Sequence, residues 1–352
     1  MVKITINDNV TKLKEKSKAK NTQDKYEGDW LKFTNYCQNK YMCNPLDVDD
    51  LESAYALTAN YMDWLHEDPE AKVFKGSSNI PGREKLNNNP YSSSPYKAST
   101  IQRILASITY KYRLNGFQFD RKNPNIAETI SAIVRDEKNN KSGQAKELLK
   151  ADIIKIIDTI PNDEEDYSNI RDKALILIGF YSFCRRSELL GMQFEHLNFG
   201  NDGVQVLIPF SKTDQTGEGR MILLPATNDD YCPVRALKHW LEIAMIEKGP
   251  LFYKINKSNT IEKYTMNYKN QKVSLNDSSF VLILKKRALA AGLENCDKIS
   301  GHSLRIGSIT QARMNGVPTY EIMAQSGHKT TQMIDRYTKL SNIKETSAAK
   351  KI

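Results

Sequence analysis

A tyrosine near the end of the chain, Tyr337, stands nine residues after a Gly-His pair in the stretch QSGHKTTQMIDRYTKL. Tyrosine can attack a phosphodiester, but its phenol has a reference pKa of about 10 and is largely protonated at neutral pH. Attack therefore needs a base near the phenol, cationic donors around the charge that develops on the phosphate, and an acid for the leaving oxygen. Taken alone, Tyr337 is one of 17 tyrosines, and core packing is the alternative interpretation.

Several polar residues upstream of the tyrosine have the types and spacing that such a site needs. In GHSLR, His302 and Arg305 are three residues apart, so in the first turn of a helix both side chains would share one face. An H-x-x-R pattern alone is a weak signal, and a surface histidine beside a surface arginine is the alternative. The residues after Arg305 strengthen the signal, because a predicted short helix over 318–326 leads to the Gly-His pair of His328 and then to Tyr337.

Together these motifs resemble the second signature box of the tyrosine recombinases, the phage integrase family. The resemblance implies a first arginine upstream, at the end of a buried helix and followed by x-x-E-L. The segment FCRRSELL, after the apolar run 174–181, supplies it. Of the two adjacent arginines, the R-x-x-E spacing selects Arg185, with Glu188 as its acidic companion and Arg186 as a neighbour that replaces the usual apolar residue. Phe183 stands where the family often has glycine.

The family also places a lysine on a β-hairpin between the two boxes. Here Lys212 follows the first of two strand-like runs, 204–210 and 220–225, which are separated by a turn-rich segment. Taken alone, Lys212 would be a solvated hairpin lysine. Its place in the series is what makes it a candidate.

The resemblance implies a role for each of these residues. Tyr337 would attack a backbone phosphate to give a 3′-phosphotyrosyl link and a free 5′-hydroxyl. The other roles are assigned by position: Arg185 and Arg305 hold the non-bridging oxygens, His328 donates a further hydrogen bond, His302 is the base, Lys212 is the acid, and Glu188 orients the site. The covalent link conserves the bond energy, so the resemblance implies no cofactor and no metal. It also implies duplex DNA with specific sites as the partner, and a tetramer that exchanges strands through a Holliday junction.

The elements that must position these residues divide the chain in two. Within 21–138, apolar residues recur at three- and four-residue spacing in four segments, which predicts four amphipathic helices. Within 148–340 we predict the two strands together with helices at about 151–160, 169–183, from 233 on, and 276–291. The predicted fold class is mainly α with a small antiparallel β-sheet: an all-α core-binding domain that clamps DNA, then an α+β catalytic domain.

The boundaries of these domains are set by composition. Residues 136–147 contain no large apolar side chain, and the linker is placed at 139–147. Residues 1–20 are expected to form a basic arm. The tail 341–352 has too few apolar residues to build a core, and docking on a neighbouring protomer and a frayed terminus both stay open for it.

The charge balance fits an anionic partner. The chain has 51 Lys and Arg against 42 Asp and Glu, a net charge of +9 and a pI of about 9.0, and nucleic acid is the commonest partner of such proteins. Six cations on two predicted helices are tentative DNA contacts, with solvated charge as the alternative for each: Arg103, Lys111, Arg113, Lys285, Lys286 and Arg287.

Cysteines and apolar runs bear on the cellular environment. The five cysteines are scattered and never in C-x-x-C spacing, which indicates free thiols and argues against a disulfide framework or a zinc site. The longest apolar run is short of the roughly 20 residues that cross a bilayer. The N-terminus does not read as a secretory signal. We therefore expect an intracellular, DNA-associated protein with no membrane partner, in the cytoplasm or nucleoid, or in the nucleus of a eukaryotic host.

Two other functions remain compatible with the same residues. A topoisomerase or telomere resolvase uses a similar set, although the Gly-His pair and the two-domain size favour a recombinase. A DNA-binding regulator could keep the fold without the chemistry. None of the six polar positions is missing, however, which favours an enzyme.

Overall fold

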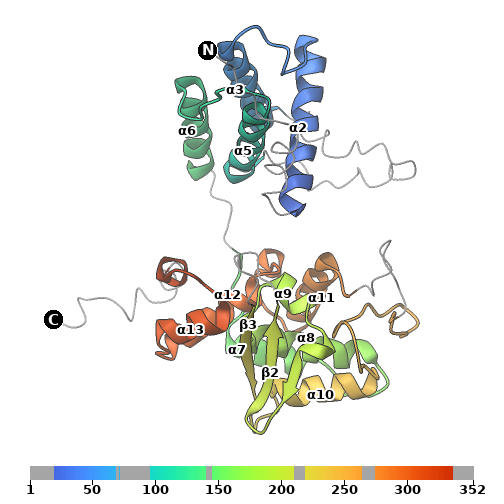
Figure 1. Cartoon of the computed structure of the whole chain (residues 1–352). Helices are drawn as coiled ribbons and strands as arrows, with labels where there is room; N and C mark the ends of the chain where they lie inside the picture. The colour runs from blue at the N-terminus through green and yellow to red at the C-terminus, as the bar shows by residue number, and fades with distance from the viewer. Residues whose placement is uncertain are drawn as a thin grey trace, which may run out of the picture. The chain divides into compact units, whose positions relative to one another are not determined.

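The computed structural model describes residues 20–68, 71, 96–139, 145–209, 219–263 and 274–335. The chain divides into two compact units, Met1–Ser142 and Gly143–Ile352. The first is helical, and the second combines helices with one three-stranded antiparallel sheet (Figure 1). Across these ranges, no helix is both long and apolar enough to cross a membrane.

The four helices predicted in the first unit are all present. They are α2 (Lys20–Tyr41), α3 (Leu51–Glu67), α5 (Ala98–Leu114) and α6 (Pro124–Asn139). Helix α3 has a capped N-terminus, because the Asp50 carboxylate accepts a hydrogen bond from the Ser53 N–H at 2.7 Å. The core of this unit is rich in aromatic rings: Phe33, Tyr61 and Tyr112 are fully buried, and the Tyr112 and Phe119 rings stack 4.9 Å apart.

The second unit has more elements than the sequence predicted. Its helices are α7 (Lys150–Asp158), α8 (Tyr167–Tyr181), α9 (Arg186–Leu190), α10 (Pro233–Ile243), α11 (Asp277–Ala290), α12 (Ser303–Met314) and α13 (Thr319–Ser326). Its strands are β1 (Leu197–Phe199), β2 (Gly203–Ile208) and β3 (Arg220–Pro225), with short 3₁₀ turns at Phe194–His196 and Cys296–Lys298. Strand β1 and helix α9 were not predicted, because three and five residues are too few to show a period.

The sheet covers one side of the helices in the second unit (Figure 1). Strand order is β1-β2-β3, and Val206 of β2 pairs with Ile222 of β3. These two side chains are buried against the core, which includes most of α8 and the fully buried Trp240 of α10. The buried α8 is the rigid element that ends just before Arg185.

The linker, placed at 139–147 within the apolar-poor stretch 136–147, borders described residues at both ends. The stretch begins in the last turn of α6, where the Glu137 carboxylate accepts from the Ala98 N–H at 2.9 Å. At the other end, the Leu148 N–H donates to Ser303 O at 3.2 Å. Gly307 permits this approach, since a Cβ there would lie 1.8 Å from Leu148 O. Composition could not show these contacts, because they join the segment to distant residues.

Candidate active site

The first signature box turns sharply between two helices. Helix α8 ends at Tyr181, and Phe183 adopts a left-handed backbone conformation with φ of 57°. This conformation explains why glycine suits the position, since residues with a Cβ adopt it at a cost. The turn makes Arg185 the N-terminal cap residue of α9.

Glu188 holds Arg185 at this turn. Its carboxylate accepts from Arg185 Nη1 at 2.7 Å and from the Arg185 backbone N–H at 2.9 Å. The second bond is one half of a capping box, in which an acidic side chain three residues into a helix satisfies a free N–H at its start. Glu188 therefore fixes both the backbone and the guanidinium of Arg185, as expected for an orienting residue.

A second cation, Arg220, also contacts Glu188 and was missed in the sequence. It is the first residue of β3, and its Nη2 donates to Glu188 Oε2 at 2.8 Å. Burial opposes the ionisation of Glu188, but the hydrogen bond and charge of Arg220, followed by those of Arg185, outweigh it and hold the pKa of Glu188 below its ordinary value. The signal in the sequence would have been that an arginine, Arg220, is the first residue of the strand-like run that follows Lys212.

Arg305 lies in the first turn of α12 and reaches the first box. Its Nη1 donates to Phe183 O at 2.6 Å and to Ser326 O at 2.8 Å, and the residue is only 4% exposed. Arg305 therefore connects the strained turn before Arg185 with the end of α13. The two boxes, about 120 residues apart in sequence, meet at this guanidinium.

His328 is buried against Arg305. Its Nε2 lies 3.0 Å from Arg305 Nη2, and its Nδ1 lies 2.8 Å from Ser326 Oγ. An arginine only donates, and Nε2 is nearer to Arg305 Nη2 than Nδ1, which lies 3.4 Å away, so we assign Nε2 as the acceptor and place the ring proton on Nδ1. Burial, followed by the charges of Arg305, Arg185 and Arg220, lowers the pKa of His328 to about 4. The imidazole is therefore neutral at physiological pH.

His302 occupies the cap position of α12 and is exposed. Partial desolvation, followed by the charges of Arg186, Arg305 and Arg185, lowers the pKa of His302. His302 is thus an exposed imidazole close to several arginines, and its lowered pKa favours the neutral form. A neutral imidazole can accept a proton, which is the property that a base near a phenol requires.

Two physical reasons favour glycine at the first position of the Gly-His pair, Gly327. Gly327 ends α13 with a φ of 69°, in the left-handed region. In addition, a Cβ at Gly327 would come within 2.8 Å of Arg220 Nη1. The missing side chain thus lets the Arg220 guanidinium lie against the backbone just before His328.

Tyr337 and Lys212 lie outside the described residues, but the segments that lead to them are described. Residues 331–335 are helical, and Ile334 is fully buried with Ile309 and Ile322 of α12 and α13. On the hairpin, β2 ends at Ile208, which pairs with Arg220. Both segments are therefore anchored beside the cluster of Arg185, Arg305 and His328.

The tentative DNA contacts of the first unit have partners within that unit. Arg103 pairs with the buried Asp29 of α2, Lys111 pairs with Glu27, and Arg113 Nε donates to Phe119 O at 2.8 Å. These bonds give all three cations a structural role. Sequence periodicity placed them on one helix but could not show these partners.

The three candidates on α11 differ from one another. Arg287 bonds Asp172 and Asn169 at 2.8 Å each, and its side chain is 11% exposed, so it belongs to the interior of the unit. Lys285 Nζ donates to Asp297 O at 2.8 Å. Lys286 is exposed and is thus the member of this set best placed to meet an external anion.

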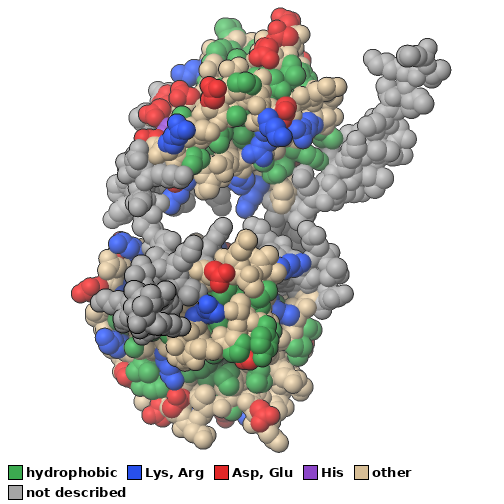
Figure 2. All heavy atoms as spheres, turned by 90° about the vertical axis from the view of Figure 1, so that its left-hand side faces the viewer, with side chains coloured by type: hydrophobic (Ala, Val, Ile, Leu, Met, Phe, Trp, Pro, Cys, Tyr) green, Lys and Arg blue, Asp and Glu red, His purple; other side chains and the backbone are tan. Residues whose placement is uncertain are grey.

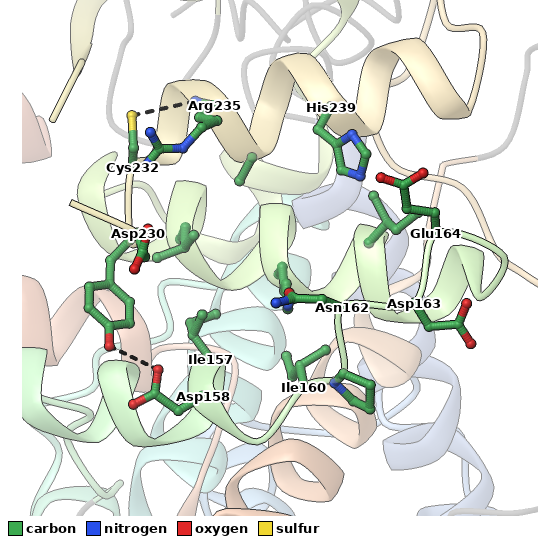
Figure 3. A pocket seen from close by; sticks show the side chains of 16 residues that line it. Ile157, Asp158, Ile160, Asn162, Asp163, Glu164, Asp230, Cys232, Arg235 and His239 are labelled. Carbon is green, nitrogen blue, oxygen red and sulfur yellow. Dashed lines mark hydrogen bonds between the residues drawn. The ribbon is translucent and has the colours of Figure 1, made fainter. Parts of the chain in front are cut away.

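A cavity of about 600 Å³ lies elsewhere in the second unit, between α7, α8 and α10 (Figure 3). Four carboxylates line it together with Lys173 and His239, and none of the candidate catalytic residues does. In the part of the chain that the structure describes, no group of three or more His, Cys, Asp or Glu residues has the arrangement of a metal site. The five cysteines are all free thiols.

The cluster of Arg185, Arg305 and His328 lies on a helical unit with a small antiparallel sheet, and comparison with known proteins identifies the family. The sequence model of the Phage integrase family matches residues 146–343. The chain is also 33% identical over 334 residues to the integrase/recombinase xerD homolog of Selenomonas ruminantium, covering 94% of this chain and 84% of the relative. The chain therefore belongs to the phage integrase family, the tyrosine recombinases, as the motifs predicted.

Solved structures agree on the fold. The XerH site-specific recombinase bound to a palindromic difH substrate has a TM-score of 0.55 at 16% identity, covering 90% of this chain and 76% of that one. The Tn1549 transposon integrase in complex with transposon right end DNA has a TM-score of 0.53 at 14% identity, covering 93% and 92%. The predicted fold class is thus confirmed.

Proposed function

We propose that this recombinase cuts and rejoins duplex DNA at specific sites, with Tyr337 as the nucleophile. The observation that carries the proposal is the meeting of the two boxes: Arg185, Arg305 and His328 converge, and the buried Ile334 anchors the chain three residues before Tyr337. In the proposed reaction the phenol oxygen of Tyr337 bonds to phosphorus, the bond to the 5′-oxygen breaks, and a 3′-phosphotyrosyl link and a 5′-hydroxyl result.

The cations of the site would stabilise the charge of the pentavalent phosphate. We propose that Arg185 and Arg305 donate to its non-bridging oxygens, since charge-assisted bonds from fixed guanidinium groups are strong and their low exposure limits competition by water. His328 can donate to the phosphate only after two changes. Arg305 has to turn away from His328 Nε2 toward the phosphate, and the imidazole proton has to move from Nδ1 to Nε2 of His328.

Proton transfer would use His302 and Lys212. His302 is exposed with a lowered pKa, which suits a base that removes the proton of Tyr337. Lys212 would protonate the leaving 5′-oxygen, and its hairpin is anchored at Arg220. Glu188 would orient Arg185. We propose no cofactor and no metal, because the phosphotyrosyl bond conserves the energy that religation needs.

The proposed partner is double-stranded DNA, and strand exchange would take place in a tetramer through a Holliday junction. The net charge of +9 supports an anionic partner. Figure 2 shows Lys and Arg side chains gathered over part of one face of the first unit, which suits the proposed DNA-clamping role of that unit as the core-binding domain. Among the tentative contacts, Lys286 is the exposed cation of α11. An intracellular, DNA-associated location follows from this partner.

The test is covalent capture on nicked suicide DNA. A binding site would first be selected by the full chain from a random-sequence duplex library, and nicked substrates would carry that site. Wild-type protein should form a protein–DNA adduct that denaturing gels resolve, and Tyr337→Phe should form none. An adduct that persists in the Phe variant would remove Tyr337 as the nucleophile. Rapid relaxation of supercoiled plasmid without the site would favour a topoisomerase instead, and binding without any adduct would favour a regulator.

A further inference from the structure

Arg220 joins the three parts of the candidate site. Its Nη2 donates to Glu188 Oε2 at 2.8 Å and lies 3.6 Å from Cys184 Sγ in the first box. The other side of its guanidinium lies on Gly327 in the second box. It is also the first residue of β3 and pairs with Ile208, the last residue of β2 before the segment that contains Lys212.

The charges around Glu188 show why a second arginine matters. The Glu188 side chain is 3% exposed, so its negative charge has to be compensated within the protein. With Arg185 as its one cation, the pair would be neutral, and Arg185 would offer a phosphate little net charge. Arg220 adds a second cation, so the three side chains together keep one net positive charge beside the site.

The contacts also fix geometry. Arg185 and Arg220 take different oxygens of the same carboxylate, Oε1 and Oε2 respectively, so rotation of Glu188 is blocked from both sides. The planar guanidinium of Arg220 covers Gly327 while it bonds Glu188, and a lysine ammonium cannot do both. The side chain is 15% exposed, and among the described residues Arg220 Nε is buried without a hydrogen-bond partner. Leaving a buried donor unpaired is costly, which argues that the position serves the site.

We propose that Arg220 is a positioning residue of the recombination site, which holds Glu188 and through it sets the guanidinium of Arg185 for the phosphate. The proposal rests on the proposed function, because it concerns the same site. It differs from two alternatives: Arg220 as a direct phosphate ligand, and Arg220 as a residue that only stabilises the fold.

Single-turnover cleavage of the nicked substrate separates these roles. Arg220→Met should slow adduct formation about 100-fold, since a displacement of about 1 Å can have that effect, while DNA affinity stays within about 3-fold of wild type. Arg220→Lys should recover part of the rate, because it restores the charge. The double variant Arg220→Met/Glu188→Gln should cleave within about 3-fold of the rate of Glu188→Gln alone. The reason is that both changes would act by loosening the same guanidinium, that of Arg185.

The control is Arg171→Met, which removes an arginine that pairs with the buried Asp172 of the same unit. It should lower the melting temperature and leave the cleavage rate of the folded protein within about 3-fold of wild type. A wild-type rate for Arg220→Met would overturn the proposal. The proposal would also be overturned if the fold-losses in cleavage rate of the two single variants multiplied in the double variant, because Arg220 would then act on the phosphate directly.

A second measurement needs no DNA. In the ¹⁵N-arginine spectrum of the full chain, Arg220→Met should increase hydrogen exchange of the Arg185 side-chain N–H groups about 10-fold, an effect that Arg171→Met should lack. Unchanged exchange would contradict the proposal even if cleavage were slow. If the wild type forms no adduct, the proposed function fails, and this spectrum still decides whether Arg220 positions Arg185.

Discussion

Two buried carboxylates in the second unit are each held by two arginines, yet they differ in what surrounds them. Asp172 accepts from Arg171 and Arg287, whose side chains are 7% and 11% exposed. Glu188 accepts from Arg185 and Arg220, whose side chains are more exposed, at 16% and 15%. The same arrangement of one carboxylate and two arginines thus occurs twice in the unit, and the arginines around Glu188 are the more exposed pair.

The local backbone adds to this difference. Around Asp172, Asn169 completes the hydrogen bonds of Arg287, and both Asn169 and Asp172 lie on the regular helix α8. Around Glu188, the preceding turn contains Phe183 at a positive φ, and its carbonyl is held by Arg305. Strained backbone and incompletely paired donors are typical of functional sites, where structure is kept for chemistry and not for stability alone.

Removing the interior carboxylate should have the largest effect on stability. Asp172→Asn leaves two arginines buried without their anion, and we expect it to destabilise the protein by about 3 to 5 kcal/mol. Urea unfolding measures this loss, with the exposed Asp158→Asn as the control. Glu188→Gln should cost less stability, because its arginines are more open to water, but it should slow cleavage. An equal loss of stability in both variants would contradict the contrast between the two sites.

Acid should weaken the site through its histidines. His328 has a pKa of about 4 in the folded chain against an ordinary value of 6.5, so the native state binds fewer protons than the unfolded state. Its contribution is complete above pH 6.5 and is lost as the pH falls toward 4, by up to about 3 kcal/mol. The lowered pKa of His302 acts in the same direction. Urea unfolding from about pH 8 to about pH 4 should show this slope, and His328→Gln should flatten it; an unchanged slope would exclude His328 as its source.

A matched pair of glycines isolates the packing on Arg220. Gly316 and Gly327 both have positive φ, at 77° and 69°, but Gly316 has open space around its Cα, whereas a Cβ at Gly327 meets the Arg220 guanidinium. Gly316→Ala should cost about 1 kcal/mol from backbone strain alone. Gly327→Ala should cost about 1 kcal/mol more and also slow cleavage. Equal losses and an unchanged rate would show that Arg220 moves aside freely.

The smallest effect concerns surface charge on α11. Lys286→Ala should lower the slope of log affinity for DNA against log salt by about one, since an exposed lysine that meets a phosphate releases about one counterion. Lys285→Ala should change it less, because Lys285 is bonded to Asp297 O. Filter binding over a salt series measures both slopes. Identical slopes for wild type and Lys286→Ala would remove Lys286 from the interface.

Much of the fold could be predicted because its signals are local. The three- and four-residue spacing of apolar residues predicted the four helices of the first unit, all of which are present. The run Arg220–Pro225 was predicted with the bounds that β3 has. Where signals were short or absent, at β1 and α9, prediction failed. The predicted roles of the site residues remain predictions for the experiments above.

The sequence by itself determined the family, the fold class and the order of the candidate residues, because these depend on spacing along the chain. Only the tertiary structure decided which cations share a carboxylate. It brought Arg220 to Glu188, gave Arg287 to the interior, and explained Gly327 by the guanidinium that lies on it. The physical reason is that an ion pair between residues about 30 or 115 positions apart leaves no periodic or local mark, since it forms only when packed elements bring the two groups together.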